Sequence, residues 1–167
     1  MTSVMRVVRA AQFAGLLALA LAAAGCANKP TDPALAGAGN APPGSQQDFV
    51  VNVGDRVFFE SDSTELTPQS IATLERQAQW LQNYNQYTFT VEGHADERGT
   101  REYNIALSNR RAHTVRDYLI SRGIPAQRMR TVAYGKERPV AICNDISCWS
   151  QNRRAQTVVN GRHDARS

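Results

Sequence analysis

The segment from Tyr87 to Arg122 places a half-buried strand before a long helix, and this order constrains the fold more than any other feature. Apolar and polar residues alternate through Val91 and the alternation ends at Gly93, as in a strand with one buried face. After a charged turn, apolar residues return at helical spacing at Ile105, Ala112, Val115 and Leu119. The strand and the helix each need a partner for one apolar face, so the sequence predicts a two-layer α+β domain.

Further strands and helices are expected in alternating order along the chain. Residues 51–59 are rich in β-branched and aromatic residues and predict one or two strands. Thr67 and Pro68 are typical of a helix start, and the helix they open carries an apolar stripe of Ile71, Leu74, Ala78 and Leu81. Strands are expected over residues 129–134 and 156–159, with a short helix over residues 147–152 between them. The order βαβαβ(α)β predicts a sandwich with helices on one face of a mixed four-stranded sheet.

The first 25 residues differ from the rest of the chain. Arg6 and Arg9 precede an almost wholly apolar run over residues 10–25 that ends in small residues. This run is short for a membrane span, which needs about 20 residues. The pattern therefore predicts a secretory signal over residues 1–25, with a short membrane anchor as the alternative.

Residues 26–47 are rich in proline and glycine, and Leu35 is their one bulky apolar residue. Such a segment cannot bury enough surface to offset its chain entropy. We therefore expect a flexible tether over residues 26–47, a folded domain over residues 48–160 and a polar tail over residues 161–167.

The charge of the chain argues against a nucleic-acid partner. The sequence has 19 basic and 15 acidic residues, and removal of Arg6 and Arg9 with the signal leaves 17 against 15. So small an excess is no electrostatic footprint for nucleic acid. Lysine occurs only at positions 29 and 136, and arginine favours paired bonds to carboxylates. The composition indicates specific ion pairing.

Cys143 and Cys148 lie close together in the sequence, in the stretch ICNDISCW. One pair of thiols in a secreted domain predicts a disulfide, and two reduced thiols in a buried corner are the alternative. We expect the pair to be a local staple outside any binding site.

Several blocks at fixed spacing carry a family resemblance. They are VFFESDSTEL at 57–66, GHADERG at 93–99, TVAYGKERPV at 131–140, QNRRA at 151–155, and the helix residues Tyr103, Asn104, Leu107, Ser108, Arg111 and Ala112. Together they resemble the OmpA-like family of peptidoglycan-binding domains. The resemblance implies a non-catalytic domain, without cofactor or metal, that binds the meso-diaminopimelate of peptidoglycan stem peptides.

That ligand ends in a zwitterion, and the resemblance implies which residues hold it. Asp96 would bind the ammonium group, and Arg111 would bind the carboxylate through paired charge-assisted bonds. Asn104 and Leu107 share the helix face of Arg111 and would form walls. Asp62 matches a further pocket residue of the family, and the Ser61 beside it stands where the family has an aromatic residue. The alternatives from spacing alone are that Asp96 caps the helix and that Arg111 makes a surface ion pair, while Arg98 and Arg110 are expected to be solvated.

The start of the chain carries a second resemblance. Small residues directly before Cys26 resemble the lipobox, which implies acylation of Cys26, and Ala27 in place of aspartate implies an anchor in the outer membrane. The resemblance to lipid-anchored members of the OmpA-like family also implies two protein partners, the periplasmic TolB propeller and TolA. It further implies that the domain faces the periplasm.

A metal-dependent peptidoglycan hydrolase is the rival function. His94, Asp96 and Glu97 could bind zinc together with His113. Their spacing is a weak match to known zinc sites, which use histidine or cysteine at short fixed intervals. The chain also has no HExxH motif and no nucleophile elbow.

Overall fold

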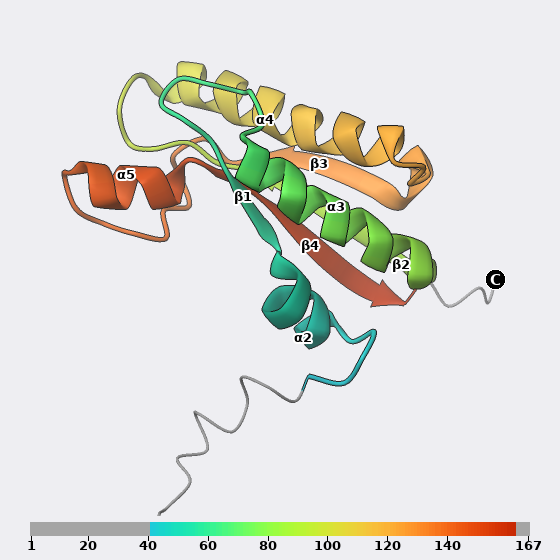
Figure 1. Cartoon of the computed structure of the whole chain (residues 1–167). Helices are drawn as coiled ribbons and strands as arrows, with labels where there is room; N and C mark the ends of the chain where they lie inside the picture. Colours follow the sequence, from blue (N-terminus) through green and yellow to red (C-terminus); the bar gives the residue numbers. More distant parts are fainter. Residues whose placement is uncertain (1–40, 163–167) are drawn as a thin grey trace, which may run out of the picture. The chain divides into compact units, whose positions relative to one another are not determined.

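The computed structural model describes residues 41–162 (Figure 1). The predicted signal over residues 1–25, Cys26, residues 26–40 of the predicted tether and residues 163–167 of the predicted tail lie outside the described residues. Among residues 41–162, no helix combines the length and the apolar character that crossing a bilayer requires.

Four strands form one mixed sheet, as predicted. They are β1 (Arg56–Phe58), β2 (Tyr87–Gly93), β3 (Met129–Ala133) and β4 (Arg154–Arg162), in the spatial order β1-β4-β2-β3. β2 and β3 run parallel, whereas β4 is antiparallel to both β1 and β2. The predicted strand ending at Gly93 is thus an inner strand of the sheet.

Two long helices, α3 (Pro68–Asn83) and α4 (Arg101–Ser121), cover one face of this sheet (Figure 1). Each starts where a threonine hydroxyl caps it, Thr67 accepting from the N–H of Ser70 and Thr100 from that of Tyr103. A 3₁₀ turn, η2 (Ala126–Arg128), leads into β3, and the short α5 (Ile146–Asn152) precedes β4. The predicted α+β sandwich with helices on one face is confirmed.

The core lies between the sheet and these two helices. Phe89 and Val91 of β2 are fully buried against residues of α3 and α4 that include Leu74, Leu81, Ala112, Val115 and Leu119. Ile71 was expected on the same stripe but is exposed. Polar side chains take the inward positions there, because Ser70 donates to the carbonyl of Phe58 and Gln77 to that of Gly54.

The prediction of strand over residues 51–59 is wrong for its first part. The chain instead forms a helical turn, α2 (Gln46–Asp48), that continues into the π-helical η1 (Phe49–Gly54). Asp48 accepts bonds from the N–H of Gly44 and the indole of Trp80, and Phe49 packs on the same indole. These tertiary contacts override the β propensity of the valines that follow.

The folded part also begins before the predicted boundary at Asp48. The hydroxyl of Tyr87 donates to the carbonyl of Gly44 at 2.8 Å, and the amide of Gln46 donates to the carbonyl of Val159 at 2.9 Å. Residues 41–47, expected in the tether, therefore pack on the start of β2 and the end of β4.

At Gly93 the backbone of α4 approaches the sheet closely. A Cβ atom at this residue would lie 1.9 Å from the carbonyl oxygen of Ser108. A real side chain there must push the helix off the strand, because backbone atoms cannot rotate away.

We expect Gly93→Ala to lower the free energy of unfolding by at least about 1–3 kcal/mol, the usual cost of overpacking. Gly161→Ala is the matched control, because a Cβ at Gly161 meets nothing within 4 Å. Urea denaturation of both variants measures the difference. Equal stability of the two variants would contradict the close approach of α4.

Candidate functional site

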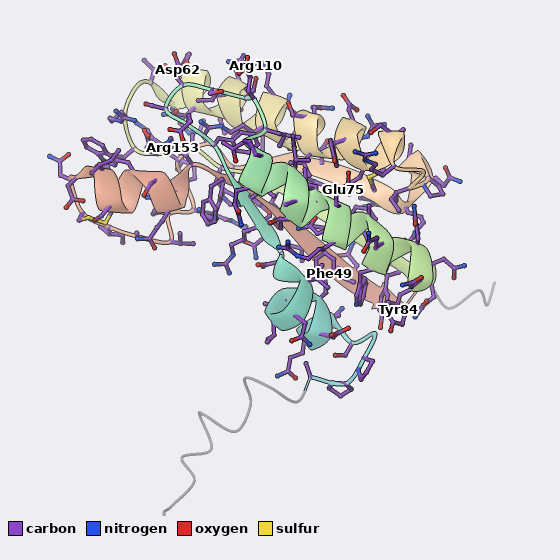
Figure 2. The ribbon with its side chains drawn as sticks, in the orientation of Figure 1. Phe49, Asp62, Glu75, Tyr84, Arg110 and Arg153 are labelled. Carbon is purple, nitrogen blue, oxygen red and sulfur yellow. A yellow bond between two sulfur atoms is a disulfide. The ribbon has the colours of Figure 1, made fainter. Side chains whose placement is uncertain are left out.

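A cavity of about 280 Å³ lies where the loop after β1 meets the β2–α4 loop. Its walls contain all five residues of the predicted ligand site: Asp62, Asp96, Asn104, Leu107 and Arg111. Arg98, Tyr103 and Arg153 also line it. Figure 2 shows Asp62 and Arg153 at the same end of the domain. The structure thus brings the predicted residues together, and their binding of a ligand stays a prediction.

Asp96 is buried, and both of its carboxylate oxygens have partners. Oδ1 accepts from the backbone N–H of Arg98 at 3.1 Å and from its Nε at 3.2 Å, and Oδ2 accepts from its Nη2 at 2.6 Å. Burial alone would raise the pKa of the Asp96 carboxyl, but the bonds from Arg98 outweigh it and hold the pKa below its ordinary value. Asp96 is therefore an anion at neutral pH. It is not the helix cap, because Thr100 occupies that position.

Arg111 is completely buried, so the alternative of a surface ion pair is wrong. Its Nε, Nη1 and Nη2 donate to the backbone carbonyls of Ser63, His94 and Glu60 at 2.9, 3.0 and 3.1 Å. Burial lowers the pKa of Arg111 to about 10, which leaves the guanidinium charged at neutral pH. A guanidinium has five N–H donors, so these three carbonyls leave one N–H on each terminal nitrogen unused.

Arg153 is a cavity residue that the sequence analysis did not single out. It is buried, its Nε donates to the carbonyl of Phe59 at 3.0 Å, and its Nη1 lies 3.5 Å from Oδ2 of Asp96 without forming a hydrogen bond. The matched block QNRRA contains it, and that block was the available signal. With Arg111 it places two buried cations beside one buried anion.

The remaining predicted residues shape the wall. Asn104 is buried and its amide donates to the carbonyl of Arg98 at 2.7 Å, while Leu107 is a buried apolar neighbour on the same helix. Asp62 has a left-handed backbone with φ of 57°, an uncommon conformation for a residue with a side chain. Its carboxylate accepts from the hydroxyl of Tyr103. This bond links the loop after β1 to the first turn of α4.

Cys143 and Cys148 form the predicted disulfide, with their Cα atoms 5.6 Å apart. Neither cysteine lines the cavity. Trp149 directly follows Cys148 in α5, donates its indole N–H to Glu97 at 2.8 Å and lies 4.4 Å from the guanidinium of Arg98. The residue after the disulfide-closed segment therefore contacts one cavity residue through its aromatic ring.

The side chains considered as zinc ligands do not form a cluster. Within residues 41–162 no group of three or more His, Cys, Asp or Glu side chains could hold a metal ion. Glu97 bonds Trp149, Asp96 bonds Arg98, and His113 is exposed on α4. The arrangement gives no support to the hydrolase alternative.

His94 is buried away from these groups and stacks on Tyr134 with ring centroids 5.4 Å apart. Neither ring nitrogen has a hydrogen-bond partner, and Nε2 lies 3.8 Å from Glu92. Burial, reinforced by repulsion from Arg154, Arg138 and Arg56, lowers the pKa of His94 to about 3. The imidazole is therefore neutral in the folded protein at neutral pH.

This burial predicts a pH-dependent stability. The unfolded state takes up a proton on His94 below its ordinary pKa of 6.5, whereas the folded state does so only near 3, so stability falls between these values as the pH drops. We expect the wild type to lose roughly 3 kcal/mol more than His94→Gln between pH 7 and pH 4. Urea titrations at both pH values measure this, with the exposed His113→Gln as control. A His94→Gln protein with the wild-type pH slope would contradict the assignment.

The fold and the site together define the class of protein. It is a small α+β domain in which one buried acid and two buried arginines surround a cavity. The model of the OmpA family matches residues 58–155, a range that includes every cavity residue named above, and the chain belongs to this family.

Similar proteins and structures agree with this assignment. The chain is 64% identical over 151 residues to the peptidoglycan-associated lipoprotein of Agrobacterium fabrum, covering 87% of this chain and 85% of that protein. It is 46% identical over 99 residues to the protein of the same name from Pseudomonas aeruginosa, covering 59% and 58%. The crystal structure of the peptidoglycan-associated lipoprotein from Burkholderia pseudomallei superposes with a TM-score of 0.65 at 37% identity, covering 70% of this chain and all of that one.

A more distant structure shares only the fold. The C-terminal domain of Helicobacter pylori MotB superposes with a TM-score of 0.61 at 21% identity, covering 66% of this chain and 87% of that one.

Proposed function

We propose that the domain binds peptidoglycan without a covalent bond and without catalysis, and links the outer membrane to the cell wall. The observation that carries the proposal is the pairing of a buried carboxylate, Asp96, with buried guanidinium groups in one small cavity. The name that the similar proteins share, peptidoglycan-associated lipoprotein, supports it.

The ligand group would be the zwitterionic end of meso-diaminopimelate. Asp96 supplies the anion for its ammonium group, and the free donors of Arg111, with Arg153 beside them, supply charge-assisted bonds for its carboxylate. Asn104 and Leu107 enclose the ligand's stem, and Asp62 lies at the rim. A cavity of about 280 Å³ admits the end of one amino acid and excludes the glycan chain.

The test compares Asp96→Asn with the wild type in a pull-down on purified sacculi, using the detergent-solubilised full chain. The amide keeps the shape of the carboxylate but not its charge, so its loss should cost about 2–5 kcal/mol, roughly 30-fold or more in affinity. Free meso-diaminopimelate should compete with wild-type binding. Arg111 is a poor choice for this test, because removing it would leave three backbone carbonyls without partners.

Arg110→Ala is the matched control, because the Arg110 side chain is exposed on α4 (Figure 2) and does not line the cavity. This variant should bind as the wild type does. Undiminished binding by a folded Asp96→Asn protein would refute the site. Release of soluble muropeptides from the sacculi would instead favour a hydrolase.

The anchor is a separate part of the proposal. We infer that residues 1–25 direct export, that Cys26 is acylated, and that the lipid holds the chain in the outer membrane with the domain facing the periplasm. The lipobox resemblance and the lipoprotein relatives support this. TolB and TolA are the proposed protein partners, on the strength of the family resemblance alone.

The anchor predicts the behaviour of one variant. Cys26→Ser cannot carry acyl chains, so the protein should leave the outer-membrane fraction once peptidoglycan is digested away. Membrane fractionation with immunodetection measures this, and the wild type should remain in the pellet. A Cys26→Ser protein that still fractionates with the outer membrane after digestion would sink the lipidation proposal.

A further inference from the structure

The carboxylate expected to bind the ligand's ammonium already has a partner within the protein. Arg98 forms a bidentate ion pair with the Asp96 carboxylate. Its Nε donates to Oδ1 at 3.2 Å and its Nη2 donates to Oδ2 at 2.6 Å. Arg98 is exposed, as expected, and forms this ion pair as well. A guanidinium and an ammonium are both cationic donors, so Arg98 fills the place that the ligand's ammonium needs.

Arg98 is also the more exposed of the two arginines whose side chains contact Asp96. Its side chain is 44% exposed, whereas those of Asp96 and Arg153 are 9% and 6% exposed. Ion pairs with one exposed member are weak in water, because the released charge is rehydrated at once. The buried cation Arg153 has no such route to solvent.

The Arg98 guanidinium makes two further contacts at the same time as it bonds Asp96. Its guanidinium carbon is 4.4 Å from the centre of the Trp149 ring, and its Nη2 donates to the hydroxyl of Ser61 at 2.8 Å. A cation over an indole face is attracted to the ring. The backbone carbonyl of Arg98 is meanwhile held by the amide of Asn104 at 2.7 Å, so the side chain can turn without the loop moving.

We propose that Arg98 is a displaceable internal cap that competes with the ligand's ammonium group for Asp96 and so determines which ligands can enter. This inference rests on the proposed function of the cavity. A ligand with an ammonium group replaces the Arg98 contact with an equivalent one, whereas a ligand without it would leave Asp96 paired with Arg98. Trp149, which follows the disulfide-bonded Cys148, already lies against this guanidinium and would keep it beside the cavity after it leaves Asp96.

The sign of one substitution separates a competitor from a ligand contact. Arg98→Ala should bind free meso-diaminopimelate about two- to fivefold more tightly than the wild type in calorimetric titration of the detergent-solubilised full chain, the range that corresponds to a surface ion pair. Arg101→Ala removes the same charge nearby, from a side chain that is 66% exposed and paired with Glu137, and should leave the affinity unchanged.

Each other result counts against the proposal. Equal or weaker binding by Arg98→Ala, with a wild type that binds, overturns the competition and leaves the proposed function standing. A wild type that binds neither diaminopimelate nor sacculi overturns both. If Arg98→Ala does not fold, Arg98→Gln takes its place, because its amide lacks the charge and should give the same tightening.

A direct measurement needs no variant. The Nε–H resonance of Arg98 in the wild type should shift when meso-diaminopimelate saturates the cavity, because its bond to Oδ1 of Asp96 is then broken. An unchanged resonance at saturation would show that Arg98 keeps its contact, and would overturn the proposal.

Discussion

The buried guanidinium of Arg111 is the interaction on which the rest of this end of the molecule depends. One side chain bonds carbonyls at Glu60 and Ser63 in the loop after β1 and at His94 beyond β2. Desolvating a charge is tolerated only where hydrogen bonds replace the lost water. These carbonyls supply that replacement, and in doing so they fix two loops to α4. The cavity is the space that remains between the loops.

The parts of the fold that follow from the sequence are those where one periodic pattern meets one buried face. β2 alternates cleanly and is buried on alternate residues, and α3 begins at the threonine and proline that predict its start. The pattern fails at residues 49–54, because the bonds of Asp48 and the packing of Phe49 on Trp80 join positions far apart in the chain. Local propensity holds no information about such contacts.

The candidate site divides in the same way. The motif places Asp96 and Arg111 in one cavity, because a family pattern at fixed spacing already encodes their geometry. The motif also distinguishes the neighbouring arginines, since Arg111 was expected in the pocket and Arg110 in solvent. Arg110 and Arg111 are adjacent, yet one is exposed and the other fully enclosed. The roles of Arg98 and Arg153 depend on the packing of α5 and the entry into β4, which no local pattern reports.

The attachment of residues 44 and 46 to the start of β2 and the end of β4 has a mechanical consequence. The chain enters the domain beside Tyr87, and the cavity lies beyond Gly93 at the other end of the same strand. A force that pulls residue 44 and a ligand bound in the cavity apart would therefore be directed along β2. Ladder hydrogen bonds lie across the strands, so this load shears all of them together and does not peel them apart one by one. The geometry suits a domain that must hold under a pull.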